Sequence, residues 1–245
     1  MEIVICESTE EAARRAARAV VDALAVRPQA VLALPTGNTP RPVYAELVRL
    51  HAAGGVSFAR ATVFNLDEYV GLPAGHPTSF RRFLSEALLQ HVDLPAQRAH
   101  APSATEANLD AAAAAYERAI AEAGGIDLAL LGIGRNGHIA FNEPGAPFDS
   151  RTRVVTLSDA TRAANQPAFG AEPVPKQAIT VGIATLLEAR RCVLLATGAA
   201  KAEAVAQAFE GVVSEQVPAS ALRGHPNLLA VLDRAAASRL TRSPG

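Results

Sequence analysis

The sequence predicts an α/β protein built on a single doubly wound (Rossmann-like), mostly parallel sheet with helices on both faces. Two observations predict this fold. Short and nearly continuous apolar runs alternate with long alanine-rich amphipathic stretches, and Gly, Pro or Asp bounds the apolar runs. Strands buried on both faces have this composition, and helices between successive strands imply parallel pairing. No repeat or linker divides the 245 residues, so we expect one domain over 1–245.

The expected elements follow from these runs in order. The first strand is "EIVIC" (2–6), and the first helix follows at 8–25, with Ser8 as N-cap and Glu11 completing a capping box. The remaining strands are expected at 30–34, 61–66, 127–133, 178–183, 192–197 and 228–232. The remaining helices are expected near 40–53, 77–91, 105–123, 199–210 and 234–241.

Composition narrows the class of partner. A net charge of −1 provides no basic face for nucleic acid or an anionic membrane. No apolar run approaches the ~18–20 residues of a membrane span, and the first residues lack the positive segment of a signal peptide. Cys6 and Cys192 lie in apolar runs without metal-ligand spacing, which indicates buried free thiols in a reducing compartment. We therefore expect a cytoplasmic protein.

In a doubly wound sheet the ligand site lies at the carboxyl ends of the strands. One strand ends in "LPTGNTP" (34–40), which turns on Gly37 and enters a helix with Thr39 as cap and Pro40 at its first position. Free N–H groups and the positive helix end favour an anion there, and Thr36 and Thr39 add hydroxyl donors. Taken alone, an ordinary capped turn has the same sequence. Lys201 opens a later helix, where its charge opposes the helix dipole unless an anion lies nearby.

Groups that can move protons follow the other strands. His138 and Glu143 lie in the glycine-rich stretch "GIGRNGHIAFNEPG" (132–145), and histidine exchanges protons near neutral pH. Asp67 and Glu68 end another strand, so at most one of them faces the site, where burial would raise the pKa of a carboxylate base. Taken alone, a turn-capping Asp beside a solvated Glu has the same sequence. The sequence contains no metal-ligand spacing and no nucleophile motif. Together these residues predict metal-free proton abstraction beside a carbonyl or imine of a small phosphorylated metabolite.

The same motifs carry a resemblance to a known family. "LPTGNTP", "FNLDEYVGL", "GIGRNGHIAFNEPG", "SRTRVVTL", "VPKQAITVGIATLLEA" and "PASAL" resemble, in this order, the pattern of glucosamine-6-phosphate deaminases. The resemblance covers essentially the whole chain. It implies an α/β fold of the sugar-phosphate isomerase/deaminase superfamily and a cofactor-free hydrolase with an isomerase-type mechanism. That enzyme converts glucosamine 6-phosphate and water to fructose 6-phosphate and ammonia in amino-sugar catabolism.

The resemblance also implies a role for individual residues. Asp67 would remove the C2 proton and return one at C1, and His138 would open the pyranose ring. Glu143 and Asn136 would hold and tune that histidine. The 6-phosphate would be held by Thr36, Gly37, Asn38, Thr39 and Lys201, and the backbone of Gly137 and Ala140 would contact the substrate.

The sequence departs from the family pattern in three respects. Position 136 is Asn where many members have Asp, so ring opening would rely more on Glu143. Gln166 and Pro167 stand where many members have an arginine that helps bind phosphate, in a segment (about 158–177) expected to be a mobile lid. Losing that charge-assisted bond weakens binding about tenfold to a hundredfold, unless Arg162 or Lys176 compensates or the enzyme takes a different substrate.

The third departure concerns regulation. Val155 stands where members activated by N-acetylglucosamine 6-phosphate carry a lysine, although Arg153 is present. We therefore expect no activation of that kind, and the resemblance leaves homo-oligomerisation open. Two other enzymes stay as alternatives, a galactosamine-6-phosphate deaminase and a 6-phosphogluconolactonase. A non-catalytic sugar-phosphate sensor is a third alternative, although the chain has no length for a DNA-binding domain.

Overall fold

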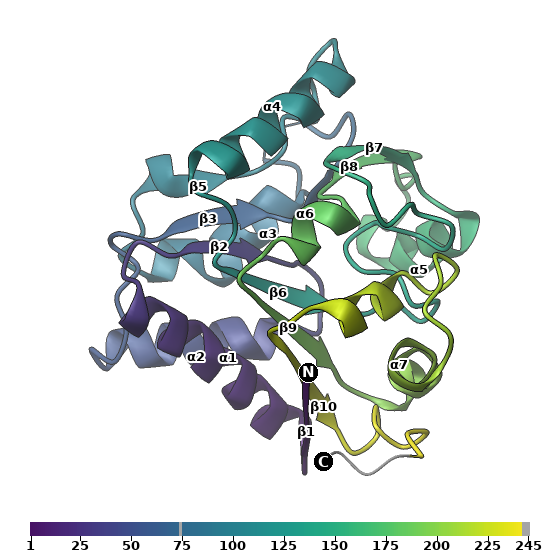
Figure 1. The fold of residues 1–245 in the computed structure, drawn as a ribbon. Coiled ribbons are helices and arrows are strands. Elements are labelled where there is room, and N and C mark those ends of the chain that lie inside the picture. Colours follow the sequence, from purple (N-terminus) through teal and green to yellow (C-terminus); the bar gives the residue numbers. More distant parts are fainter. Residues whose placement is uncertain (74, 242–245) are drawn as a thin grey trace.

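The computed structural model describes residues 1–73 and 75–241. Its main sheet contains seven parallel strands in the order β1-β10-β9-β6-β2-β3-β5 (Figure 1). Their bounds are β1 Glu2–Cys6, β2 Val31–Leu34, β3 Thr62–Asn65, β5 Ala99–His100, β6 Leu128–Gly132, β9 Arg191–Ala196 and β10 Leu228–Asp233. This parallel sheet with flanking helices confirms the expected fold class.

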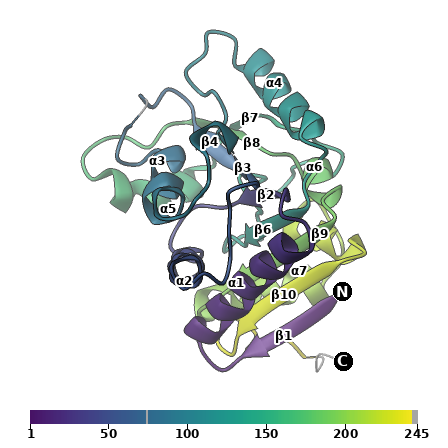
Figure 2. The same ribbon diagram turned by 90° about the vertical axis from the view of Figure 1, so that its left-hand side faces the viewer.

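Helices cover both faces of this sheet, because successive strand residues point to opposite sides. Leu128 and Leu130 of β6 pack in the cluster that holds the buried faces of α1 (Thr9–Val26), α2 (Arg41–Ala52) and α3 (Phe80–Ala87). The alternate residues Ala129 and Leu131 pack in the cluster beneath α4 (Leu109–Glu122), α6 (Ile183–Leu187) and α7 (Ala202–Glu210). Figure 1 shows α1 and α2 on one side of the sheet and α7 on the other, and Figure 2 shows α1 beside β10 and β1.

The first helix begins as its sequence predicts, with one difference. The Ser8 hydroxyl accepts a hydrogen bond from the Glu11 N–H at 3.2 Å, which confirms Ser8 as the N-cap. The Glu11 carboxylate accepts from the N–H of Glu7 at 2.7 Å, one residue before the cap. The reciprocal bond of the expected capping box is therefore made to the residue before the cap and not to Ser8.

A second, antiparallel sheet was not expected. It has the order β4-β8-β7, with β4 at Asp67–Tyr69, β7 at Arg153–Thr156 and β8 at Gln177–Thr180. The strand expected at 178–183 is β8 of this sheet, and α6 begins at Ile183. The small sheet lies beside the carboxyl ends of the main strands and carries α5 (Asp159–Phe169) against its aromatic side chains.

Two local expectations were wrong. Residues 234–239 form turns, because the Asp233 carboxylate accepts from the N–H of Ala236 at 2.7 Å directly after β10 and holds the chain in a tight turn. Helix α2 begins at Arg41 with Pro40 as its N-cap residue, so Thr39 does not cap it. A preceding turn, closed by the Arg41 N–H and the Asn38 carbonyl at 3.3 Å, occupies that position.

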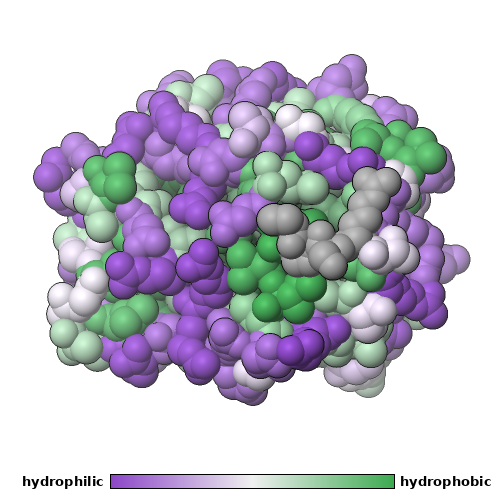
Figure 3. All heavy atoms as spheres, turned by 60° about the horizontal axis from the view of Figure 1, so that its bottom comes forward, coloured by the Kyte–Doolittle hydropathy of each residue, from purple (hydrophilic) through white to green (hydrophobic). Residues whose placement is uncertain are grey.

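Cys6 and Cys192 are buried free thiols, as expected. Few large hydrophobic side chains are exposed over the described part of the chain, and they are scattered along it: Met1, Ile5, Val26, Val212 and Val213. The face in Figure 3 is mainly hydrophilic, with a small central hydrophobic patch. Over the same residues, no helix is both long and apolar enough to cross a membrane.

Candidate active site

The expected site residues follow strands that are neighbours in the sheet. Strand β6 lies between β9 and β2, and β3 lies on the far side of β2. Because all four are parallel, the segments that leave their carboxyl ends meet at one edge of the sheet. They are 35–40 after β2, 66–69 after β3, 133–145 after β6 and 197–201 after β9.

Within the segment after β6, His138, Glu143 and Asn136 form one unit. Nδ2 of Asn136 donates to Glu143 Oε2 at 2.7 Å, and Asn136 Oδ1 accepts from the His138 N–H at 3.3 Å. Nδ1 of His138 lies 3.8 Å from the same Glu143 oxygen, which is ion-pair range but beyond a hydrogen bond. That ring nitrogen is buried and has no hydrogen-bond partner in the described chain. A small rotation of the imidazole ring would bring Nδ1 close enough to donate a hydrogen bond to Glu143.

The first turn of α5 also binds Glu143. Oε1 of Glu143 accepts from the hydroxyl of Thr161 and, at 3.3 Å, from the hydroxyl of Ser158, which is the N-cap of α5. Burial favours the neutral acid, but the His138 ring and the bonds from Thr161 and Asn136 outweigh it and lower the pKa of Glu143 to about 2. Glu143 is therefore ionised at neutral pH and lies at the positive end of a helix.

Backbone conformation allows this unit to form. A Cβ at position 134 would overlap the His138 ring, so only glycine fits there. Gly137 has φ +83°, and its carbonyl accepts from the Ala219 N–H at 2.9 Å, which ties the loop to the "PASAL" segment. Ala140 has φ +50°, an uncommon conformation for a residue with a side chain. The strain lies in the loop that holds the histidine.

Asp67 differs from every other carboxylate near the site. It is 6% exposed, and no group in the described residues is hydrogen bonded to its carboxylate. Burial, together with the negative charge of Glu68, raises the pKa of Asp67 to about 8. A buried carboxyl group with a pKa near working pH and free lone pairs is suited to accept a proton from a bound molecule.

Glu68 points away from Asp67, as the alternation along a strand predicts. Its carboxylate accepts from the Ser79 hydroxyl at 2.7 Å and from the N–H groups of Phe80 and Arg81 at 3.1 and 3.0 Å. It also accepts from the N–H of Tyr69 at 2.9 Å. Glu68 therefore caps the start of α3, and it has no lone pair free for chemistry.

Strand β8 joins Asp67 to the histidine loop. Asp67 pairs with Thr180 in the small sheet, and the Thr180 hydroxyl accepts from the Phe141 N–H at 3.1 Å. One residue on, the Val181 carbonyl accepts from the buried Asn142 side chain at 2.8 Å. Arg153 donates to the other end of that amide at 2.8 Å. The base and the histidine thus share one rigid support.

The expected anion site also keeps its donors free. Gly37 has φ +103°, and in the described residues the side chains of Thr36, Asn38 and Thr39 form no hydrogen bond. Half-buried Lys201 follows β9, and its turn is fixed by the Asp233 carboxylate, which accepts from the Gly198 N–H at 2.9 and 3.0 Å. Burial, with the positive charge of Arg135, lowers the pKa of Lys201. An anion between these groups would relieve that cost.

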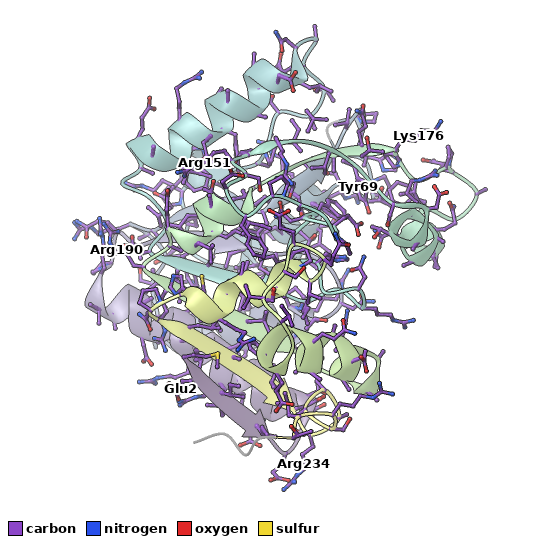
Figure 4. The ribbon with its side chains drawn as sticks, turned by 45° about the vertical axis from the view of Figure 1, so that its right-hand side comes forward. Glu2, Tyr69, Arg151, Lys176, Arg190 and Arg234 are labelled. Atoms are coloured by element: carbon purple, nitrogen blue, oxygen red, sulfur yellow. The ribbon has the colours of Figure 1, made fainter. Side chains whose placement is uncertain are left out.

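Where the family's arginine was expected, the structure places no cation. The Gln166 amide donates to the carbonyls of Gly170 and Glu172 at 3.0 and 2.8 Å and so fastens the end of α5, while Pro167 lies exposed in that helix. Arg162 is ion paired with Asp159. Lys176 is exposed, and Figure 4 shows its side chain at the outer edge of the molecule. Neither is held in the anion site.

Sequence reasoning missed several supporting residues. Ser158 and Thr161 bind Glu143 through their hydroxyl groups, and Gly134 makes room for the His138 ring. The Thr180 hydroxyl holds the Phe141 N–H of the histidine loop. The N-cap pattern at Ser158 was readable, but its contact with Glu143 was not, because the two are 15 residues apart. In the described chain no group of three or more His, Cys, Asp or Glu side chains is placed to hold a metal ion.

Comparisons with known proteins place this arrangement in a family. The model of the glucosamine-6-phosphate isomerase/6-phosphogluconolactonase family matches residues 6–230. The chain belongs to this family. It is 51% identical over 243 residues to a glucosamine-6-phosphate deaminase of Rhodopirellula baltica, covering 99% of this chain and 97% of the relative. It is 44% identical over 239 residues to glucosamine-6-phosphate deaminase 1 of Bacillus subtilis, covering 97% of this chain and 99% of the relative.

Solved structures agree with the fold. A structure described as a monomeric glucosamine-6-phosphate deaminase superposes with a TM-score of 0.95 at 44% identity and covers 97% of this chain and 99% of its own. A 6-phosphogluconolactonase from Trypanosoma cruzi superposes with a TM-score of 0.80 at 24% identity and covers 98% and 97%. The second likeness extends to the fold alone.

Proposed function

We propose that the chain is a glucosamine-6-phosphate deaminase, which converts glucosamine 6-phosphate and water to fructose 6-phosphate and ammonia. The observation that carries this proposal is Asp67, a buried carboxyl group that has no hydrogen-bond partner among the described residues and lies on the same support as the His138–Glu143–Asn136 unit. A base for a carbon acid and a separate proton shuttle are both needed for this reaction. Hydrolysis of a lactone would leave Asp67 without a carbon proton to remove.

Ring opening comes first in this mechanism. Nε2 of His138 takes the proton of the anomeric hydroxyl and returns one to the ring oxygen, which breaks the bond between C1 and that oxygen. Ionised Glu143, 3.8 Å from Nδ1, stabilises the imidazolium that forms between the two transfers. The product is an open-chain aldehyde, whose C2 proton is far more acidic than that of the ring.

The isomerisation is then assigned to Asp67. Its carboxylate removes the C2 proton, and the electron pair forms a C1–C2 double bond while the aldehyde oxygen is protonated to give an enolamine. Returning a proton at C1 gives an imine at C2, to which water adds and from which ammonia leaves. The substrate's ammonium group would favour ionised Asp67 on binding, which brings a base with a pKa of about 8 into its active form.

The phosphate is assigned to the turn after β2 and to Lys201. The hydroxyl and amide groups of Thr36, Asn38 and Thr39, which have no partner in the described part of the chain, supply donors, and Gly37 lets the backbone approach the ligand. We assign the segment 158–177 to a lid, because the first turn of its helix contacts Glu143. We also propose one domain over 1–245 and a cytoplasmic location, which suits two buried free thiols.

The direct test mixes the purified protein with glucosamine 6-phosphate and follows ammonia and fructose 6-phosphate together. We expect equal amounts of both products, with Asp67→Asn reducing the rate about 10²-fold to 10⁴-fold, the usual contribution of a general base. Galactosamine 6-phosphate and 6-phosphogluconolactone are run beside it. Faster turnover of either one than of glucosamine 6-phosphate would reject the assigned substrate.

A further inference from the structure

Arg135 lies on the segment between the two groups of residues that form the candidate anion site. The donors assigned to the phosphate come from the segments after β2 and β9, and these strands flank β6 on its two sides. Arg135 lies in the segment after β6, three residues beyond Gly132, which pairs with Leu195 of β9. The topology therefore places Arg135 between Thr36–Thr39 and Lys201.

Arg135 is a cation without a carboxylate partner in residues 1–73 and 75–241. Its side chain is exposed and forms no ion pair or hydrogen bond with any described residue. Lys201 likewise has no carboxylate partner there, and burial lowers the pKa of its amine, with a further contribution from the positive charge of Arg135. Two neighbouring cations with no acidic partner repel each other, and a shared anion removes the repulsion.

The neighbours of Arg135 fix its position. Gly134 lies against the His138 ring, and Asn136 is bonded to Glu143. The backbone on both sides of Arg135 is therefore held by the proton-moving unit. The Cα of Arg135 thus lies at a set distance from His138, and its side chain starts from a fixed point beside the residues that would bind the anomeric carbon of a sugar.

We propose that Arg135 binds the 6-phosphate of the substrate with Lys201 and supplies the guanidinium charge that residues 166–167 lack. Gln166 is engaged with the carbonyls of Gly170 and Glu172, and Pro167 carries no donor. Arginine suits this position because its planar fork binds two phosphate oxygens at once. The identity of the ligand as a sugar phosphate rests on the proposed function. The proximity of Arg135 and Lys201, and hence a site for an anion, does not.

The test combines kinetics with direct binding. We expect Arg135→Gln to raise KM for glucosamine 6-phosphate about tenfold or more, the effect of losing a charge-assisted hydrogen bond, with kcat and its pH profile unchanged. Calorimetric titration with fructose 6-phosphate should show the same weakening. Arg135→Lys should recover part of the affinity. In the double variant with Lys201→Gln, the losses should not add, because both cations contact one anion.

Arg14→Gln is the matched control, since Arg14 is exposed on α1 and its loss changes the net charge equally. Equal weakening in that variant would mean general electrostatic attraction and would overturn the assignment. An unchanged KM in Arg135→Gln, or a fall in kcat alone, would overturn it as well. If the wild type produces no ammonia, titration with inorganic phosphate decides separately: weaker binding in Arg135→Gln supports the anion site, and equal binding rejects it.

Discussion

Asn136 donates from Nδ2 to Glu143 Oε2 at 2.7 Å and accepts at Oδ1 from the N–H of His138 at 3.3 Å. The amide is thus used at both ends. An ionised aspartate could accept from His138 but could not donate to Glu143, whose carboxylate is charged because its pKa is about 2. Asparagine at this position therefore complements the ionised Glu143. Because the amide carries no charge, Glu143 is the residue of this unit whose negative charge can stabilise a protonated His138.

Asn136→Asp should change the pH dependence of the reaction. It places two carboxylates within hydrogen-bond distance, which cannot both ionise easily, so the pair takes up a proton and the pKa of Glu143 rises from about 2. We expect kcat to fall most at acid pH, with the variant approaching the wild type as the pH increases. Profiles measured between pH 5 and pH 9 check this, and parallel profiles would contradict it.

Asp67→Asn should stabilise the protein in a pH-dependent way. Folding raises the pKa of Asp67 from 3.8 to about 8, so the folded state holds this proton more tightly than the unfolded state. The resulting stability is fully present below about pH 4 and is lost as the pH rises through 8. Asparagine needs no proton, so the Tm difference between variant and wild type should increase from pH 4 to pH 9. Asp110→Asn, in the exposed first turn of α4, is the control and should show no such increase.

Gly134→Ala tests the space beneath the histidine. The added Cβ would overlap the imidazole ring of His138, so the ring must leave its position or the loop must shift. We expect a loss of activity of about 10²-fold or more, the size of a misplaced acid–base group, while far-ultraviolet circular dichroism stays native. Gly224→Ala is the control, because a Cβ there meets no atom within 4 Å. Full activity in Gly134→Ala would show that catalysis does not require the His138 ring to stay against position 134.

Gln166→Ala should loosen the end of α5. It removes two hydrogen bonds, to the carbonyls of Gly170 and Glu172, each worth about 1 kcal/mol. Amide hydrogen exchange in 158–177 should become faster, with little change in the rest of the chain. The control Gln207→Ala removes a single exposed bond to Glu203 on α7 and should leave that segment unchanged. Equal exchange in the two variants would mean that Gln166 does not fasten the segment.

We expect N-acetylglucosamine 6-phosphate to leave the substrate saturation curve unchanged. Val155 packs against the aromatic cluster of Tyr69, Phe141 and Phe169, and Arg153 is bonded to the Asn142 amide. Val155 brings no charge to a second phosphate, and Arg153 is held by its bond to the buried Asn142 amide. Steady-state kinetics at increasing concentrations of this compound check the prediction, and a fall in the substrate concentration at half-saturation would disprove it.

The parallel core was predictable because it depends on local composition. Strands such as β6 are uniform apolar runs, and their helices carry alternating buried and exposed residues over many turns. The small sheet was not predictable, because β4 has three residues and one of them is the buried acid Asp67. Its pairing with β8 depends on contacts more than 100 residues apart along the chain. Periodicity cannot show such contacts.

The residue types of the site were predictable from the sequence, but the hydrogen bonds among them were not. The motifs place Asp67, His138 and Glu143 at strand ends, and the structure brings those ends together. The motifs cannot show that Glu68 caps α3, that Thr161 contacts Glu143 or that Gln166 closes the end of its own helix. Each of these depends on which carbonyl or carboxylate is in reach after folding. The missing helix at 234–241 has the same cause, since Asp233 sets the turn from its side chain.

The direction of β1 has a practical consequence. All seven main strands are parallel, and Met1 stands at the start of β1, so it lies at the opposite end of the sheet from the functional loops. An affinity tag or a surface tether at this terminus extends away from the substrate entrance. Immobilised through its first residue, the protein should turn over substrate as it does when free.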